Sequence, residues 1–597
     1  MTDAIDPTDP TDPTDADMGT ETADAPEPAP APPAGDESPA WSRRRPQWQT
    51  ALAVGVVGLV FVLPMRALLR YQGPPMEEGF MLVFPERVLA GDMPHKDFLH
   101  LYGPGSLWAL AAWYKLLGVS LTAERLFGMA QLGAIVFGVM ALVRPWGRRV
   151  VLASGVIGVL LTTTAIGLTA LAWDGAVALA VAGAWAGLRG RRWLTDAPGV
   201  DRSVAERAAG RFLIASGALA GLALLFRPDV IVAVGISTAA LLAGLGWGRW
   251  KRWLTGAVPV LSLYVVHLAL SGPGDAIEGM VIQPVFDLRD GRSLPRPPSH
   301  THYDGALQAV AQLRQQPWSG PAMSGPWQIY VWFFLLLAVV AFVVAVGVWS
   351  VRRDPDRWQS RVLLVAGLLG LGLMPQALQR PDTTHFAWVS CVPFAVLPAA
   401  LAELGRIQPI ALVRRQAGTI AAVLTLLIPL LVIPYFSTRT YVDLVKQSRP
   451  GNEVFGYPVR YSGRTFYLGA KDIAPVAQRM LDDVGPQMDK GQRLLVGTAD
   501  LRKTPYSDAY LYYLLPKMTP GTRYIEMDPG VANAPDSGLA HEVATSDWLI
   551  LSHIWDAWSE PNASRDFGSG APNREVQRHF CAVGDYLPYF EVYRRCR

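Results

Sequence analysis

Residues 106–118 read SLWALAAWYKLLG, and the assignment of this apolar run decides the topology of the whole chain. A helix that crosses a bilayer needs about 20 mostly apolar residues. The run is shorter than that and contains Lys115. We therefore predict that it forms an interfacial or re-entrant helix that does not cross the membrane.

Runs that are long enough to cross a membrane occur on both sides of this segment. The composition supports them, because 51% of the residues are hydrophobic and only 17% are charged, whereas soluble domains carry about 25% charged residues. The predicted spans are 50–69, 122–143, 149–170, 174–188, 211–226, 230–247, 254–271, 327–350, 361–377, 386–404 and 417–437. The predicted fold class is a polytopic α-helical membrane bundle of about 11 transmembrane helices with a C-terminal extracytoplasmic α/β domain.

Clusters of arginine between these runs indicate the orientation. If 106–118 is not a span, every cluster falls on one side of the membrane, and positive charge marks the cytoplasmic side. The clusters are Arg43–Arg45, Arg144 with Arg148 and Arg149, Arg189–Arg192, Arg249–Arg252, Arg352 with Arg353 and Arg357, and Arg414 with Arg415. We expect a multi-pass protein of the cytoplasmic (plasma) membrane, with a cytoplasmic N-terminus and an extracytoplasmic C-terminal domain.

Three parts follow from this assignment. Residues 1–46 form an acidic, Pro-rich, low-complexity segment, which we expect to be a disordered cytoplasmic tail. The transmembrane part is 47–437, with outer loops at 70–121 and 272–325, and the extracytoplasmic α/β domain is 438–597. Within that domain we predict strands at 493–500, 547–552 and 590–596 and helices at 506–515 and 572–580.

The cysteines fit the same arrangement. Cys391 falls inside an apolar run, where we expect it to pack as a small hydrophobic residue. Cys581 and Cys596 lie in the C-terminal domain, where an oxidising compartment permits a disulfide, although the sequence does not decide whether they pair. The chain has no basic tract of the kind that binds nucleic acid, so we expect no nucleic-acid partner.

The first outer loop contains side chains that are suited to acid–base chemistry. Glu77 and Glu78 directly follow the first span, Asp97 and His100 are three residues apart, and Tyr102 opens a Tyr-Gly-Pro-Gly turn. An ordinary polar loop is the alternative reading. The combination of acids, a histidine and short apolar helices in one outer segment makes these residues candidates for catalysis and substrate binding.

Asp174 interrupts an otherwise uncharged stretch at a predicted outer turn. It can cap the next helix, which is the structural alternative. An acid near the edge of a bilayer is costly, and this cost favours a functional role.

The tripeptide Arg-Pro-Asp occurs twice, at 227–229 and at 380–382, both times at a predicted outer end of a helix. Pro and Asp start helices well, but this does not explain Arg227 and Arg380, which run against the charge bias of the outer loops. A guanidinium at such a position can bind a phosphate through two hydrogen bonds. Asp382 and His385, one turn apart, are further candidates for substrate binding, with helix capping as the alternative.

No cofactor follows from the sequence with certainty, and a divalent metal is one option. His300 and His302 have a spacing that can bind a metal, but in a Pro-rich loop this signal is weak. The chain has no P-loop and no convincing dinucleotide-binding fingerprint.

The order of these features resembles the GT-C superfamily of membrane glycosyltransferases. It is most similar to the branch with protein O-mannosyltransferases and the aminoarabinose and galacturonic acid transferases of bacterial envelopes. The resemblance covers about residues 50–405. It implies that an acid of the pair Glu77–Glu78 is the catalytic base, with Glu77 in the place of the usual Asp. It also implies that Asp174 is the second acid, and that Arg380 and Arg227 hold the phosphate of the donor.

The predicted function is therefore transfer of a sugar from a polyprenyl-phosphate donor to an envelope glycan, lipid or protein on the outer side of the membrane. One alternative is a transporter or flippase for lipids or sugars. Another is a non-catalytic envelope assembly protein that acts through its C-terminal domain. That domain is also a candidate for carbohydrate binding, although most of its aromatic residues are expected in its core. These aromatic residues are Tyr506, Tyr510, Tyr512, Tyr513, Trp548, Trp555 and Trp558.

Overall fold

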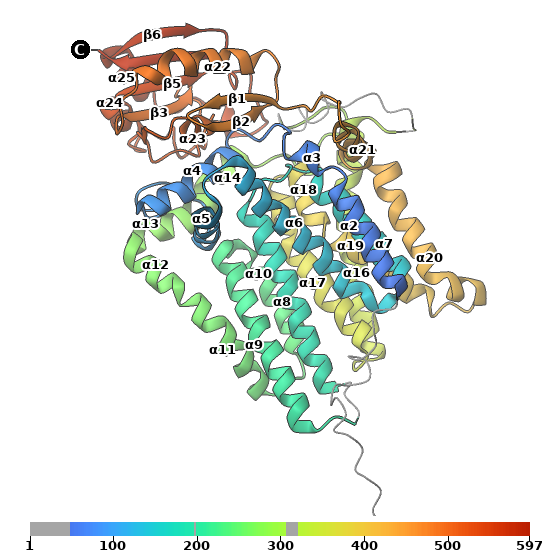
Figure 1. Ribbon diagram of the computed structural model, residues 1–597. Coiled ribbons are helices and arrows are strands. Elements are labelled where there is room, and N and C mark those ends of the chain that lie inside the picture. Colours follow the sequence, from blue (N-terminus) through green and yellow to red (C-terminus); the bar gives the residue numbers. More distant parts are fainter. Residues whose placement is uncertain (1–47, 196–198, 306–319, 321, 597) are drawn as a thin grey trace, which may run out of the picture.

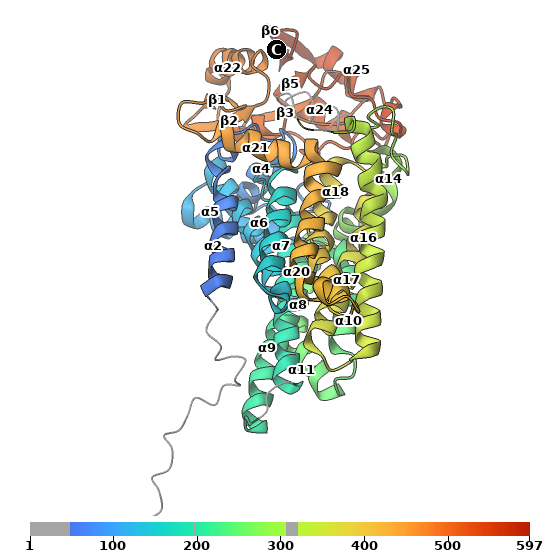
Figure 2. The ribbon, with the colours of Figure 1, turned by 90° about the vertical axis from the view of Figure 1, so that its right-hand side faces the viewer.

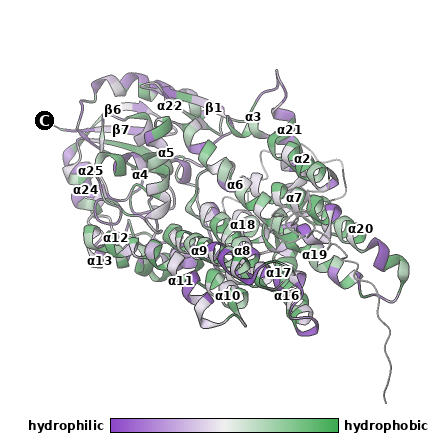
Figure 3. Ribbon diagram, turned by 60° about the horizontal axis from the view of Figure 1, so that its bottom comes forward, coloured by the Kyte–Doolittle hydropathy of each residue, from purple (hydrophilic) through white to green (hydrophobic). Residues whose placement is uncertain are grey.

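The computed structural model describes residues 48–195, 199–305, 320 and 322–596. The expected tail at 1–46 and the cluster Arg43–Arg45 lie outside these residues, as does part of the loop 272–325. A bundle of long helices forms one part of the molecule, and a domain with a β-sheet covers one end of this bundle (Figures 1 and 2). Hydrophobic residues dominate the helices of the bundle (Figure 3).

Within the described residues, seven helices are long and apolar enough to cross a membrane, so the chain is a multi-pass membrane protein. They are Gln49–Leu68, Leu121–Trp146, Arg202–Phe226, Trp247–Ser271, Gly325–Arg353, Trp358–Gln379 and Ala411–Val432. The pair Thr383–Ser390 and Pro393–Gly405, bent by 45°, makes an eighth if it is one span. The predicted number of about 11 is therefore not confirmed.

The three other predicted spans also contain helices, but these are less suited to crossing a membrane alone. Helix α7 (Arg148–Thr163) has 16 residues, and the apolar stretch Pro228–Leu242 is also short. Helix α8 (Ala172–Thr195) is long but rich in Ala and Gly, and it packs between α6 (Leu121–Val143) and α9 (Arg202–Phe226). Neighbouring helices cover most of the surface of α7 and α8, whereas the stretch Pro228–Leu242 keeps exposed apolar side chains at Ile231 and Val232.

The remaining elements of the bundle lie between Trp48 and Phe436. They are α2 (Trp48–Val62), α3 (Met65–Leu68), η1 (Arg144–Trp146), η2 (Pro228–Val230), α10 (Ile231–Leu242), α11 (Trp247–Leu261), α12 (Leu263–Ser271), α16 (Gly325–Arg353), α17 (Trp358–Gln379), α18 (Thr383–Ser390), α19 (Pro393–Gly405), α20 (Ala411–Leu427), η4 (Ile428–Val432) and η5 (Pro434–Phe436).

Small residues let α9 and α11 approach each other closely. A Cβ atom on Gly217 would lie 1.9 Å from the carbonyl oxygen of Trp253, and one on Gly256 would lie 1.9 Å from that of Ile214. Both distances are far below contact, so no larger side chain fits there. Glycine at such crossings is typical of helix packing in membranes, where van der Waals contact is the main attraction.

Short helices form a layer between the bundle and the domain. They are α4 (Glu77–Ala90), α5 (Gly105–Leu117), α13 (Pro273–Ile277), the π-helical segment η3 (Glu278–Asp287) and α14 (Leu288–Arg292). Helix α5 is the segment at 106–118, and it is not among the helices that are long enough to cross a membrane. It packs on α4 and buries Leu107, Leu110 and Tyr114, while Leu116 is 78% exposed. One apolar face is thus available to lipid, as expected for an interfacial helix.

The C-terminal domain contains a five-stranded mixed sheet of strand order β4-β3-β5-β7-β6. Strands β3 and β4 and strands β3 and β5 are parallel, whereas β7 is antiparallel to both β5 and β6. The elements are α21 (Thr438–Gln447), the hairpin β1 (Tyr457–Tyr461) and β2 (Arg464–Leu468), α22 (Ile473–Val484), η6 (Gly485–Gln487), β3 (Arg493–Thr498), α23 (Tyr510–Leu514), β4 (Thr519–Pro520), α24 (Leu539–Thr545), β5 (Trp548–Ser552), η7 (Ala563–Arg565), α25 (Ala571–His579), β6 (Phe580–Tyr586) and β7 (Phe590–Arg595).

The predicted strands at 493–500, 547–552 and 590–596 are confirmed as β3, β5 and β7, and the helix at 572–580 as α25. The predicted helix at 506–515 is wrong in extent, because only Tyr510–Leu514 are helical. Residues 506–509 are irregular since their side chains bond elsewhere: the Ser507 hydroxyl donates to the Ile525 carbonyl, and the Tyr506 hydroxyl donates to Glu77.

A disulfide joins Cys581 on β6 to Cys596 just beyond β7, with Cα atoms 5.3 Å apart. It links the two ends of the last hairpin of the sheet. Cys391 is a buried free thiol, as expected.

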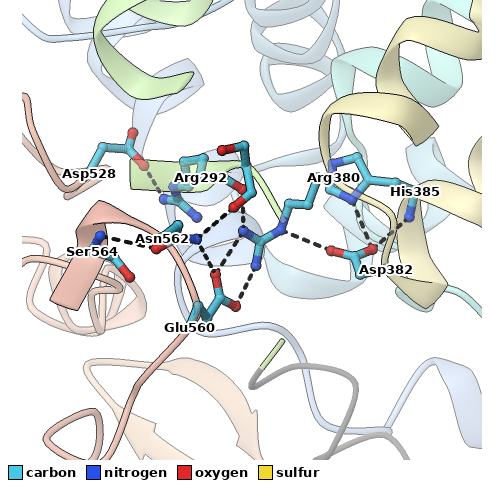
Figure 4. Close-up of polar contacts among 9 residues, drawn as sticks. Arg292, Arg380, Asp382, His385, Asp528, Glu560, Asn562 and Ser564 are labelled. Atoms are coloured by element: carbon cyan, nitrogen blue, oxygen red, sulfur yellow. Dashed lines mark hydrogen bonds and ion pairs between the residues drawn. The ribbon is translucent and has the colours of Figure 1, made fainter. Parts of the chain in front are cut away.

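Two ion pairs, one of them buried, hold the domain on the rest of the chain. The guanidinium of Arg380, at the end of α17, binds both oxygens of Glu560 at 2.6 and 2.9 Å (Figure 4). The two side chains are 8% and 1% exposed. A second pair, between Arg464 of β2 and Glu86 of α4, joins the domain to the intermediate layer. Charged pairs of this kind fix the position of a domain, because separating them leaves charges without partners.

Glu560→Gln should therefore weaken the attachment of the domain. We expect a loss of about 3 kcal/mol in the free energy of unfolding, because Arg380 keeps its buried charge without its main partner. Thermal unfolding of the full chain in detergent measures this. The control is Glu575→Gln in α25, whose partner Arg578 is 64% exposed, and we expect it to change stability by less than about 0.5 kcal/mol. Equal melting of the two variants would contradict the assignment.

Candidate active site

Glu77 lies where two cavities meet. One cavity, of about 480 Å³, is lined by Glu77 and by the rings of Tyr506, Trp555 and Trp558, and we call it the aromatic cavity. The other has a volume of about 590 Å³, and we call it the arginine cavity. Its cationic residues are Arg227, Arg289, Arg292, Arg296 and Arg380. Glu77, Ile166 and Thr384 line both cavities, so the carboxyl group of Glu77 stands at their junction.

The surroundings of Glu77 suit it to take up a proton. It occupies the first turn of α4 and is partly accessible from the cavities. Burial raises the pKa of its carboxyl group, and the hydrogen bond from the Tyr506 hydroxyl and the charges of Arg292 and Arg380 oppose this rise. A carboxylate with a raised pKa is a stronger base than an exposed one.

Glu78, the neighbouring acid, has a different environment. Both of its oxygens accept hydrogen bonds from Arg125 of α6, each at 2.7 Å, and the two side chains are 1% and 2% exposed. Arg125 also donates to the carbonyl oxygens of Leu68 and Tyr71. Glu78 lines neither cavity, and its geometry is that of a buried structural pair that holds α4 on the bundle.

Asp174 lies in the first turn of α8 and is 3% exposed. It lines neither cavity, but the residue before it, Trp173, lines the arginine cavity. The guanidinium of Arg227 lies 5.3 Å from the centre of the Trp173 ring and 4.1 Å from that of Tyr102. Asp174 is thus placed behind the wall of the cavity rather than in it.

Both arginines of the Arg-Pro-Asp repeats bind the aspartate of their own repeat. Arg227 donates two hydrogen bonds to Asp229, at 2.9 and 2.6 Å. Arg380 donates to Asp382 at 2.9 Å as well as to Glu560 and to the carbonyl oxygen of Arg292 (Figure 4). An Asp two residues after an Arg is close enough to neutralise it. The expected role of Arg380 as a phosphate ligand therefore fits its contacts poorly, because four of its five N–H groups already donate to protein oxygens.

Asp382 also caps α18. Its Oδ1 accepts hydrogen bonds from the backbone N–H and from Nδ1 of His385, both at 2.9 Å (Figure 4). Asp382 and His385 line the arginine cavity, and so does Tyr102. The capping alternative is correct for Asp382, and it places His385 at the wall of the cavity.

Asp97 and His100 are not brought to the cavities. Asp97 is exposed, and its carboxylate accepts a hydrogen bond from the N–H of Met93 at 2.7 Å. His100 is fully buried, with its ring 5.6 Å from that of His95 and 5.5 Å from that of Tyr102. These two residues support the shape of the first outer loop.

The sequence interpretation missed the cations that suit an anion best. Arg289 and Arg292 belong to α14, Arg296 follows it, and all three line the arginine cavity. Arg292 pairs with Asp528 of the C-terminal domain (Figure 4). Arg289 and Arg296 are exposed, and neither forms an ion pair with another residue in the described part of the chain. Arginines three and four residues apart in an outer loop were the available signal.

His300 and His302, the candidate metal ligands of the sequence, contact other residues. In the ranges that the structure describes, no group of three or more His, Cys, Asp or Glu side chains is placed to hold a metal ion. His302 pairs with Asp304 at 3.3 Å, and the ring of His300 packs on Trp327. The spacing of these two histidines does not produce a metal site there.

The site therefore combines a base at a junction and two cavities. The arginine cavity on one side holds five arginines and, besides Glu77, the carboxylates of Asp229, Asp382, Glu526 and Asp528, and the aromatic cavity lies on the other side. The site lies at one end of a membrane bundle, under a domain with a mixed sheet. Such a site can bind an anion next to a substrate hydroxyl that gives its proton to Glu77.

No protein-family model and no curated protein matches the chain. Among solved structures, the chain is similar to ArnT from Cupriavidus metallidurans bound to undecaprenyl phosphate, with 15% identity, a TM-score of 0.46 and coverage of 91% of this chain and 97% of that one. It is also similar to the Archaeoglobus fulgidus oligosaccharyltransferase in the apo form, with 12% identity, a TM-score of 0.47 and coverage of 93% and 75%. A third is AglB from the same organism in complex with an inhibitory peptide and a dolichol-phosphate, with 10% identity, a TM-score of 0.44 and coverage of 92% and 75%.

These solved proteins are GT-C glycosyltransferases, the superfamily that the sequence resembles.

Tyr506→Phe should raise the pKa of Glu77 further, because it removes a hydrogen bond that favours the charged carboxylate. The carbonyl stretch of the protonated carboxyl, identified by its loss in Glu77→Gln, should then persist to higher pH than in the wild type. Infrared difference spectra across a pH series measure this midpoint. The control is Tyr512→Phe, which removes a buried hydroxyl that bonds the Val496 N–H instead. If the pH midpoint of the Glu77 carbonyl stretch in Tyr506→Phe equals that of the wild type or is lower, the hydrogen bond is ruled out.

Proposed function

We propose that this chain is a membrane glycosyltransferase that moves a sugar from a polyprenyl-phosphate carrier to a hydroxyl group of an envelope glycan, lipid or protein. The observation that carries the proposal is the position of Glu77, between a cavity with arginines and a cavity without them. A transfer from a lipid phosphate needs a base for the acceptor and positive charge for the leaving group. Glu77 stands at the junction, and the arginines line the cavity on one side of it.

The reaction can be written from these residues. The acceptor oxygen attacks the anomeric carbon of the donor sugar, and a new carbon–oxygen bond forms as the bond from that carbon to the phosphate oxygen breaks. The phosphate leaves with the bonding electron pair, and Glu77 accepts the proton of the acceptor hydroxyl. The raised pKa of Glu77 suits this step. Arg289, Arg292 and Arg296 would stabilise the charge of the leaving phosphate.

Asp174 acts in this proposal through its neighbour Arg227 and not on the substrate itself. The charge of Arg227 acts on Asp174, and Arg227 in turn lies over the ring of Tyr102 in the cavity wall. We infer that Asp174 and Asp229 together hold the Arg227 guanidinium at the cavity. Arg227 would then contribute to the positive potential without binding the phosphate through all its donors.

The proposed topology has about 11 crossings, an N-terminus in the cytoplasm and the C-terminal domain outside the plasma membrane. The end of α8 and the beginnings of α9 and α11, near the basic clusters at 189–192 and 249–252, lie at the end of the bundle that is farthest from the domain (Figures 1 and 2). The disulfide between Cys581 and Cys596 supports an oxidising compartment for the domain. Both cavities would then face outward.

Glu77→Gln should lower transfer by about 10²–10⁴-fold, the usual contribution of a general base, while membrane insertion is unchanged. Release of polyprenyl phosphate from a labelled lipid-linked sugar, in membranes that contain the acceptor, measures transfer. The control is Glu575→Gln in α25, since Glu575 lines neither cavity and its partner Arg578 is 64% exposed. Wild-type transfer by Glu77→Gln would rule out Glu77 as the base, whereas no transfer by the unchanged chain would favour a flippase or an assembly protein instead.

The double variant Arg289→Met with Arg296→Met should weaken binding of polyprenyl phosphate at least about tenfold, because both cations face the cavity without a carboxylate partner. Its thermal stability should stay within about 0.5 kcal/mol of the wild type, as is usual for exposed positions. Arg380→Met should lower stability more than this, because it leaves Glu560 buried without its partner. Binding to the chain in nanodiscs is measured by native mass spectrometry. Unchanged affinity in the double variant would move the phosphate site elsewhere.

A further inference from the structure

The aromatic cavity lies on the far side of Glu77 from the arginines and has no part in holding the donor phosphate. We propose that it is the acceptor subsite and that it takes a carbohydrate, with one ring of the acceptor glycan stacked on the aromatic wall and one of its hydroxyl groups at Glu77. The inference rests on the proposed function and names the acceptor class that the proposal leaves open.

The wall of this cavity is built from three aromatic rings of the C-terminal domain. The Tyr506 ring lies 4.5 Å from that of Trp555 and stacks on that of Trp558 at 5.3 Å, with an angle of 17° between their planes. All three residues line the cavity. The C–H faces of a sugar ring pack well on broad rings of this kind, whose apolar area is large and whose side chains have few rotamers to lose.

Asp508 gives the cavity a polar group without a full set of partners. It lines the cavity and is fully buried. Its Oδ2 accepts a hydrogen bond from the Trp555 indole N–H at 3.1 Å, and the Ser552 hydroxyl is near enough to favour the charged carboxylate, but Oδ1 makes no hydrogen bond of good geometry. A buried carboxylate oxygen that lacks a donor is costly, and a sugar hydroxyl would supply that donor. Burial raises the pKa of Asp508 to about 6, with the Ser552 hydroxyl and the Trp555 indole opposing the rise.

The opposite wall comes from the bundle and is mostly apolar. Thr383 and Thr384 of α18 add hydroxyl groups to it, and residues 163–167 line the adjoining edge. The described residues that line this cavity include no Lys or Arg, and its ionisable acids are Glu77 and Asp508. A phosphate or another anion would find no cation here, so the charge distribution separates this cavity from the arginine cavity.

Tyr506 connects the wall to the chemistry. Its ring is part of the aromatic stack, and its hydroxyl donates to the Glu77 carboxylate. A sugar that is stacked on these rings therefore has its edge beside the base. The aromatic cavity has the volume of an ordinary small-molecule site, about 480 Å³.

Binding of free sugars tests this without any donor. The full chain in nanodiscs is mixed with methyl glycosides of hexoses and pentoses, and saturation-transfer NMR records which of them bind. We expect at least one glycoside to bind, and Trp555→Leu and the isosteric Asp508→Asn each to weaken its binding at least tenfold. The control is Tyr512→Phe, a buried tyrosine of α23 that lines neither cavity, which should bind as the wild type does.

Three results would overturn the inference: no glycoside binds, the two variants bind as well as the wild type, or the two variants lose polyprenyl phosphate instead, which would make the cavity a lipid site. Failure of the proposed function is separate. It would appear as no transfer by the unchanged chain or as unchanged phosphate binding by the arginine double variant, whether or not glycosides bind in the aromatic cavity.

Discussion

The hydrogen bond from the Tyr506 hydroxyl to the Glu77 carboxylate joins the C-terminal domain to the membrane part at the junction of the two cavities. It requires the domain to sit in one position on the bundle. The buried pair of Arg380 with Glu560 and the pair of Arg292 with Asp528 fix that position from the other side of the arginine cavity. The chemistry of the site thus depends on how firmly the C-terminal domain is attached to the membrane part.

Much of the fold could be predicted because its signals are local. Long apolar runs mark the helices, and short apolar runs between turns mark β3 and β5. The helix at 106–118 could be separated from the spans by its length and by Lys115. The number of spans was harder to predict, because α8 is covered by other helices and needs less apolar surface than a helix that faces lipid.

The site was only partly predictable because its contacts join distant residues. Glu77 and Glu78 are equivalent in the sequence, yet Arg125 takes Glu78 and leaves Glu77 to the cavities. The sequence predicts that Arg380 is available to a ligand, but Glu560, 180 residues later, is its partner in the structure. Arg289 and Arg296 could have been found by the rule that singled out Arg227 and Arg380, since all four are arginines in predicted outer segments. Tyr506 stands only among the aromatic residues expected in the domain, and no sequence pattern places it or Asp508 beside α4.

The bundle and the C-terminal domain build the aromatic cavity together, and this limits how the domain can be exchanged. One of its walls is made by α18 and the segment after α7, and the other by residues of the C-terminal domain. A domain taken from a relative would bring its own rings and lose the match with the bundle, even if it folded well. The domain is therefore not an exchangeable module in the way that a tethered binding domain is, because one wall of the cavity would stay behind with the bundle.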